Sequence, residues 1–183
     1  KNGIPFCLST VATCKPEDID PLNQMSSKSK WFQLYPPKDL DILDSLLTRV
    51  KNSGFSTLVI TVDIPAPSRR ERSKHAGLNM PLKFSPKLII DGLIHFKWTI
   101  TTIKNGLPRL KTVESYANNN SLKFVSKFVG NILGGIIDWK YIELIRSKWE
   151  GPMILKGVLH PDDAFKAKQI GCDSVYVSNH GAR

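Results

Sequence analysis

Residues 151–183 read GPMILKGVLHPDDAFKAKQIGCDSVYVSNHGAR, and this stretch decides the fold. Residues 152–156 predict a strand, residues 161–170 predict a helix that Gly171 ends, and residues 174–178 predict a short buried strand. A strand, a helix and a strand in succession favour two parallel strands joined by a right-handed crossover. In such α/β proteins the functional groups gather beyond the carboxyl ends of the strands.

His180 and Arg183 follow the last of these strands, and Gly181 allows a sharp turn between them. An imidazole at this edge is a candidate proton acceptor, and a guanidinium is a candidate partner for an anionic substrate group. A strand followed by Asn-His-Gly is a weak signal alone, because a histidine in such a loop is as often a plain backbone-bonded residue.

The same alternation of strands and helices runs through the rest of the chain. Further strands are expected at residues 5–9, 31–35 and 57–63, and the last is an apolar run typical of a strand buried on both faces. Further helices are expected to start at 15–19 and to span 39–52 and 138–149. The helix at 39–52 has five apolar residues on one face: Leu40, Leu43, Leu46, Leu47 and Val50. Strands that alternate with helices, without hairpin turns, indicate an α/β fold with a parallel sheet.

The composition is that of an ordinary globular domain. With 183 residues, 41% of them hydrophobic and 23% charged, the chain suits one domain with a sizeable core. Its start does not resemble a secretory or transit segment, and no apolar run is long enough for a transmembrane helix. Cys7, Cys14 and Cys172 are odd in number and lack metal-ligand spacing, so we expect reduced thiols and no metal site.

The positive charge is concentrated in one segment. Residues 66–130 hold 12 Lys and Arg against 3 Asp and Glu, a net charge of +9, whereas the remainder carries only +1 of the total of +10. A local basic field of this kind predicts an anionic partner, which is a lipid head group, a nucleic acid or an acidic protein. The alternative is a solvated basic loop without a partner.

Polar or ionisable residues follow each of the five predicted strands. They are Ser9 and Thr10, Gln33 and Tyr35, Thr61 and Asp63, Lys156, and His180 with Arg183. Each residue alone has a structural explanation, such as a turn cap for Asp63 or a backbone hydrogen bond for Gln33. Together they favour one site at the rim of a (β/α) barrel, because the carboxyl ends of parallel strands share an edge.

Several motifs resemble a known family. They are SNHGAR at 178–183, WFQLY at 31–35, TVD at 61–63 with RRER at 69–72, and LKG at 155–157. In their order along the chain, and over essentially its whole length, these motifs resemble those of the FMN-dependent α-hydroxy-acid dehydrogenases and oxidases. This family includes L-lactate dehydrogenases, mandelate dehydrogenase and glycolate oxidase. The segment at about 74–137, with GLIHFKW at 92–98 and NGLP at 105–108, is most similar to the membrane-associated bacterial branch.

The resemblance implies a partial (β/α)₈ TIM barrel. The five predicted strands correspond to barrel strands two to six, in a single domain, 1–183, with the basic insertion 74–137 after strand four. Because a complete barrel needs about 250 residues, we expect a fragment truncated at both ends. Such a fragment is expected to expose its sheet edges, to bind FMN poorly and to be inactive by itself.

The resemblance also implies the cofactor and the site residues. FMN is the cofactor, and no metal is involved. His180 corresponds to the base, Asp63 to the carboxylate that holds the imidazole, and Tyr35 to a hydrogen-bonding partner of the substrate. Arg70 and Arg183 correspond to the clamp on the substrate carboxylate. The residues that correspond to flavin contacts are Ser9, Gln33, Thr61 and Lys156, the last as a cation near the flavin N1 and C2 oxygen.

The expected function is oxidation of an L-2-hydroxy acid, L-lactate or a mandelate-like acid, to the 2-oxo acid. The electrons leave either as a hydride or through a carbanion. Apolar and basic residues interleave in residues 80–130, as an interfacial segment requires. We therefore expect a cytoplasmic enzyme, peripheral on the inner face of the cell membrane, that passes electrons to quinone and the respiratory chain. The resemblance implies a homo-oligomer, and the lack of a nucleic-acid-binding motif argues against a nucleic-acid partner. The alternatives are a lid formed by this segment, an oxygen-using oxidase, another FMN barrel such as an isomerase, and a non-catalytic basic binding module on a degenerate barrel.

Overall fold

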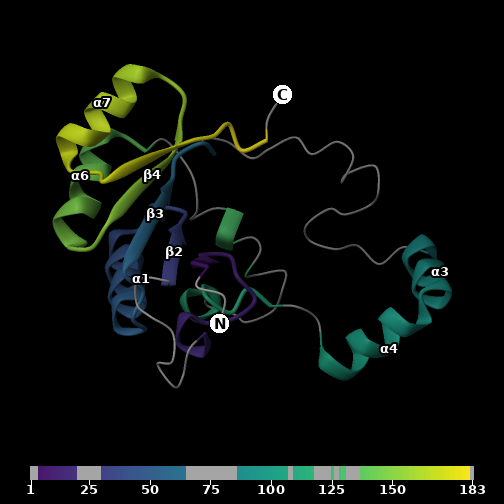
Figure 1. Ribbon diagram of the computed structural model, residues 1–183. Coiled ribbons are helices and arrows are strands. Elements are labelled where there is room, and N and C mark those ends of the chain that lie inside the picture. Colours follow the sequence, from purple (N-terminus) through teal and green to yellow (C-terminus); the bar gives the residue numbers. More distant parts are fainter. Residues whose placement is uncertain are drawn as a thin grey trace.

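The computed structural model describes residues 4–19, 30–64, 86–106, 109–117, 125, 128–130 and 137–181. One parallel sheet holds five strands in the order β1-β2-β3-β4-β5 (Figure 1). These strands are β1 (Phe6–Ser9), β2 (Lys30–Leu34), β3 (Thr57–Thr61), β4 (Met153–Val158) and β5 (Ser174–Val177). In a (β/α)₈ barrel the strands follow one another in the sheet in the same order as in the chain. In a doubly wound sheet the strand order changes direction partway across the sheet. The prediction of an α/β fold with part of a TIM barrel is confirmed.

The helices occupy the predicted places and several others. They are η1 (Pro16–Asp18), α1 (Leu40–Asn52), α3 (Pro86–Ile94), α4 (Phe96–Asn105), η3 (Glu114–Tyr116), α6 (Trp139–Lys148) and α7 (Pro161–Ile170). The expected helix start at 15–19 is only a single 3₁₀ turn. Helices α3 and α4 were not predicted, although Phe96, Ile100 and Ile103 recur at helical spacing, because the apolar and basic residues of this segment were interpreted only as an interfacial pattern.

Helix α1 shows how local chemistry sets the elements. The carboxylate of Asp39 accepts hydrogen bonds from the backbone of Asp41 and Ile42, which caps the first turn. Four of the five predicted apolar residues are buried, whereas Leu40 is exposed. The prediction was wrong for Leu40 because it lies in the first turn, at the edge of the apolar stripe rather than at its centre.

Side chains on the two faces of the sheet have different roles. One face packs against α1, α6 and α7, which Figure 1 shows together on the same side of the strands. The strand residues of this core are Leu8, Phe32, Leu34, Leu58, Ile60, Met153, Leu155 and, past an irregularity in the register of β4, Val158. Because side chains alternate along a strand, the residues next to the core residues point to the other face. Four polar residues on that face lie at or near the carboxyl ends of their strands: Ser9, Gln33, Thr61 and Lys156.

Strand β5 differs from its prediction. We expected a buried strand, but Tyr176 and Val177 are exposed, and Val177 keeps 74% of its surface accessible. The reason is its place in the sheet, since β4 is its one strand partner among the described residues. An apolar strand needs neighbours on both sides to be buried, and β5 has one.

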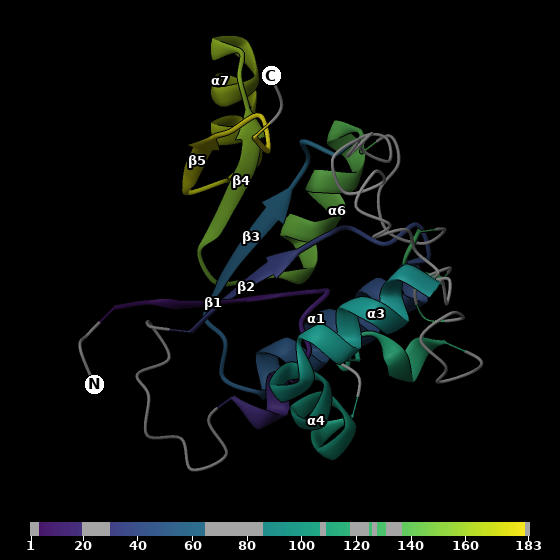
Figure 2. The same ribbon diagram turned by 90° about the vertical axis from the view of Figure 1, so that its right-hand side faces the viewer.

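Helices α3 and α4 form a pair that stands away from the sheet (Figure 1). The Thr99 hydroxyl on α4 donates to the Gly92 carbonyl on α3 at 2.7 Å, which ties the two helices together. Figure 2 shows the pair from the side on which it lies. No helix in the described part of the chain is long and apolar enough to cross a membrane.

Candidate active site

Asp63, two residues beyond β3, is the centre of the site. Its Oδ1 lies 3.0 Å from His180 Nδ1, and its Oδ2 accepts hydrogen bonds from Lys156 Nζ at 2.8 Å and from Ser178 Oγ at 2.9 Å. The Asp63 side chain is only 5% exposed. The structure therefore brings together a buried carboxylate after β3, an ammonium on β4, and a hydroxyl and an imidazole after β5.

The three neighbours of Asp63 keep its carboxyl ionised. Burial works to raise the pKa of Asp63, but hydrogen bonds from its three partners and the charge of Lys156 outweigh burial, so its pKa lies below the ordinary value. A carboxylate with a lowered pKa stays negative at neutral pH. It is thus suited to hold a neighbouring imidazole and to stabilise that ring when it gains a proton.

The ring of His180 has a defined orientation. Its Nδ1 faces Asp63 Oδ1 and also lies 3.2 Å from Lys156 Nζ. Lys156 can only donate a hydrogen bond and the ionised Asp63 can only accept one, so Nδ1 bonds to one of them at a time. The shorter contact, with Asp63, is made when the proton lies on Nδ1 of a neutral ring. The other nitrogen, Nε2, then carries the lone pair. In this tautomer His180 can accept a proton at Nε2, with Asp63 balancing the positive charge that develops.

Tyr35, just after β2, faces the same histidine. The two ring centroids lie 6.4 Å apart, with 55° between the ring planes. The turn that carries Tyr35 is held by the buried hydroxyl of Thr10, which accepts from Tyr35 N at 3.0 Å and donates to the carbonyl of Gln33 at 2.8 Å. The end of β1 thereby positions the aromatic residue at the end of β2.

The four residues predicted to contact the flavin lie on neighbouring strands. Ser9 pairs with Gln33 across β1 and β2, and Thr61 pairs with Lys156 across β3 and β4. The amide of Gln33 donates to Thr61 Oγ1 at 2.6 Å, which joins the two pairs. Ser9 Oγ accepts from its own turn, at Val11 N. These four predicted residues thus form one polar band across four strands.

The other predicted site residues are only partly placed. Arg70 and Arg183 lie outside the described residues. The ion pair of Asp63 with Lys156 was not predicted, and neither were two further contacts of Asp63, those with Ser178 and with Gly157. For Ser178 the sequence could have indicated only the local hydrogen bond to the His180 backbone, because hydroxyls in turns often bond to nearby backbone, and not the contact with Asp63. No sequence signal pointed to the contact with Gly157.

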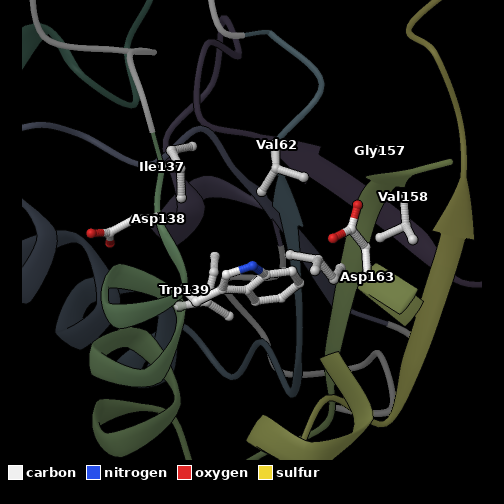
Figure 3. A pocket seen from close by; sticks show the side chains of 9 residues that line it. Val62, Ile137, Asp138, Trp139, Gly157, Val158 and Asp163 are labelled. Atoms are coloured by element: carbon white, nitrogen blue, oxygen red, sulfur yellow. The ribbon is translucent and has the colours of Figure 1, made fainter. Parts of the chain in front are cut away.

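A separate pocket of about 280 Å³ lies between the sheet and two helices. Its walls come from the end of β3, from β4, and from α6 and α7, and Figure 3 shows Trp139 between Asp138 and Asp163. Neither Asp63 nor His180 lines it. The pocket is therefore distinct from the cluster around Asp63. Among the described residues no group of three His, Cys, Asp or Glu side chains could hold a metal ion.

Comparisons with known proteins show which family the chain resembles. Residues 1–183 match the family described as FMN-dependent dehydrogenase. The chain is 37% identical to an L-lactate dehydrogenase of Yersinia pestis (strain Pestoides F) over 185 residues, covering all of the chain and 48% of that protein. It is 38% identical to an L-lactate dehydrogenase of Pseudomonas aeruginosa (strain LESB58) over 183 residues, covering 99% of the chain and 47% of that protein.

A solved structure is similar over the same range. The monotopic membrane protein (S)-mandelate dehydrogenase superimposes with a TM-score of 0.86 at 29% identity, covering 99% of this chain and 47% of that one. The chain spans about half the length of the curated relatives that it matches.

Proposed function

Because the chain belongs to the family of FMN-dependent dehydrogenases, whose cofactor is FMN, we propose that the protein oxidises an L-2-hydroxy acid to the corresponding 2-oxo acid. The single observation that carries the proposal is the contact of Asp63 with His180 Nδ1, which directs Nε2 to a reacting group. The names of the relatives, L-lactate and (S)-mandelate dehydrogenases, support L-lactate or a mandelate-like acid as the substrate.

The polar band fits a flavin. An isoalloxazine ring has hydrogen-bond donors and acceptors along its edge and gains negative charge when it is reduced. Gln33 supplies an amide, Thr61 a hydroxyl and Lys156 an ammonium, on three neighbouring strands. In the proposal these three residues and Ser9 hold the ring, and the positive charge of Lys156 favours its reduced form. When bound, FMN accepts the two electrons that leave the substrate.

The remaining residues bind the substrate and move its proton. His180 Nε2 accepts the proton from the hydroxyl or the α-carbon of the substrate, and Asp63 stabilises the resulting imidazolium. Tyr35, whose ring faces His180, hydrogen-bonds the substrate oxygen atoms. In the same proposal Arg70 and Arg183 clamp the substrate carboxylate, for which a planar guanidinium is suited.

The α3–α4 pair supports a membrane-associated dehydrogenase. In this proposal residues 74–137 are an insertion within one barrel domain that rests peripherally on the inner face of the cell membrane and brings the site close to quinone. The apolar side chains of α3 and α4 that are exposed to solvent are Ile89, Ile90, Leu93, Ile94, Phe96, Trp98, Ile100 and Ile103. Residues 86–106 also hold three Lys against one Asp, which suits anionic lipid.

Reduction of the flavin by substrate tests the proposal. The full-length protein loaded with FMN is mixed anaerobically with L-lactate or L-mandelate, and loss of the visible flavin band is followed. We expect bleaching with an L-acid, no bleaching with the D-acid, and a loss of about 1,000-fold in rate for His180→Gln. No bleaching with any 2-hydroxy acid would favour another FMN barrel or a non-catalytic binding module. Rapid reoxidation by oxygen, with hydrogen peroxide formed, would indicate an oxidase.

A further inference from the structure

His180 has an unusual backbone conformation for a proton acceptor. Its φ is +58°, and it is the one described residue other than glycine with a positive φ. Left-handed backbone costs a residue with a Cβ about 1 kcal/mol, so the surrounding contacts must hold it in place. Gly181 N, donating to Asn179 Oδ1 at 3.1 Å, stabilises the far side of the turn. The side of the turn that precedes His180 is held by Ser178.

The hydroxyl of Ser178 makes two hydrogen bonds that meet at the same pair of residues. It accepts from the backbone N–H of His180 at 3.0 Å, and it donates to Asp63 Oδ2 at 2.9 Å. The other oxygen of Asp63 faces the ring of His180. Ser178, Asp63 and His180 therefore form a closed cycle of three hydrogen bonds, which fixes the backbone and the ring of the histidine against one carboxylate.

We propose that Ser178 is the positioning residue of the site: its hydroxyl holds the left-handed turn at His180 and orients the Asp63 carboxylate toward Nδ1. This inference rests on the proposed function, in which Nε2 of His180 accepts the substrate proton. The two hydrogen bonds of Ser178 go to the His180 backbone and to Asp63, not to the imidazole ring. Ser178 acts because a hydroxyl can accept from the main chain and donate to the carboxylate at once.

The groups around His180 determine what loss of the hydroxyl changes. Among the described residues its ring faces Asp63 after β3, Lys156 on β4 and the phenol ring of Tyr35 after β2. Without Ser178 the carboxylate loses one donor, and the turn loses the bond that holds the side preceding His180. The contact between Asp63 and Nδ1 is then held less firmly, and the ring of His180 is free to turn away from the carboxylate.

The test compares Ser178→Ala with Ser178→Thr, which keeps the hydroxyl, in full-length protein loaded with FMN. For Ser178→Ala we expect kcat to fall roughly 10- to 100-fold while KM stays within about threefold. We also expect the downfield NMR signal of the His180 Nδ1–H, which reports its hydrogen bond to Asp63, to broaden or disappear because the ring is held less rigidly. Ser178→Thr is expected to restore both. Ser174→Ala, at the other end of β5, is the matched control and changes neither.

Three outcomes would overturn the inference. They are an unchanged His180 Nδ1–H signal in Ser178→Ala, an equal loss of that signal in Ser178→Thr, or the same loss in Ser174→Ala. If Ser178→Ala does not fold, Ser178→Cys, similar in size but only a weak donor, replaces it under the same criteria. The NMR measurement needs no turnover, so it still tests the positioning role if no 2-hydroxy acid reduces the flavin and the proposed function fails.

Discussion

Gly157 packs directly against Asp63, with no room for a side chain between them. A Cβ at position 157 would lie 2.6 Å from the Asp63 Cβ and 2.7 Å from the Asp63 backbone nitrogen. Gly157 also has a φ of +109°, a conformation that residues with a Cβ rarely adopt. Glycine on β4 therefore lets the carboxylate after β3 approach the neighbouring strand, where Lys156 and His180 reach it.

Substitution of this glycine should damage both stability and the site. We expect Gly157→Ala to lower the free energy of unfolding by about 3 kcal/mol, because backbone strain and a clash with backbone atoms add together. Gly106→Ala is the matched control, since Gly106 has a φ of +79° but nothing within 4 Å of an added Cβ. With φ +79° and ψ 170°, Gly106 lies in a region open essentially to glycine alone, so Gly106→Ala should cost about 1 to 2 kcal/mol from strain alone. Urea denaturation measures both, and equal losses would contradict the close packing.

Removal of the Asp63 charge should disable His180. We expect Asp63→Asn to lower kcat/KM roughly 1,000-fold, because an amide can donate to Nδ1 and so favour the wrong tautomer. The acid limb of the pH profile should move to lower pH, since the imidazolium loses its stabilising anion.

Asp44→Asn provides the control for that substitution. Asp44 is a half-exposed carboxylate paired with Lys148 at 2.8 Å, away from the site. Its loss should change kcat/KM by less than about twofold, because exposed ion pairs contribute little. A similar loss of activity in the two variants would argue against a specific role for Asp63.

Tyr141 should make stability depend on pH under alkaline conditions. Burial, followed by the charges of Asp44 and Asp39, raises the pKa of Tyr141 from 10.0 to about 12, and its hydroxyl donates to the carbonyl of Pro37. Because the folded pKa is the higher one, its contribution is complete below about pH 10 and is lost as the pH rises toward about 12.

Tyr141→Phe should therefore lower the free energy of unfolding at neutral pH by about 1 kcal/mol. It should also flatten the decline of that free energy above about pH 10. Urea unfolding over this pH range is the measurement. Tyr176→Phe, at an exposed tyrosine of β5, should leave the wild-type curve unchanged. If the two variants behave alike, the alkaline loss does not come from Tyr141.

The α3–α4 pair should bind anionic lipid. Leu93 and Ile103 are 74% and 76% exposed, so replacing both with serine removes apolar area without disturbing the core. We expect binding to phosphatidylglycerol vesicles to weaken about tenfold or more, since each lost apolar contact with lipid contributes about 1 kcal/mol. Co-sedimentation with the full-length protein measures this.

The matched control for lipid binding is Leu159→Ser. Leu159 is 66% exposed but lies between β4 and α7, away from the α3–α4 pair. It should bind vesicles like the wild type. Unchanged partitioning of the Leu93→Ser/Ile103→Ser variant would leave a lid over the active site as the better explanation of this segment.

The sequence alone determined the strands and the edge on which the chemistry lies. The apolar run that became β3 must be buried on both faces, and parallel strands share one carboxyl edge. Asp63, Lys156 and His180 were therefore expected at one rim before any distance was known. The motifs around them were also sufficient to predict the FMN-dependent family.

The tertiary structure alone decided which atoms meet at that rim. Ser178 and Asp63 are 115 residues apart in the chain, and neither residue type signals the other. Their contact, the close approach of Gly157 and the exposure of β5 depend on strand register and on which strand lies at the edge. A local sequence pattern encodes the period and burial of one element, whereas register between distant elements emerges only when their side chains pack together.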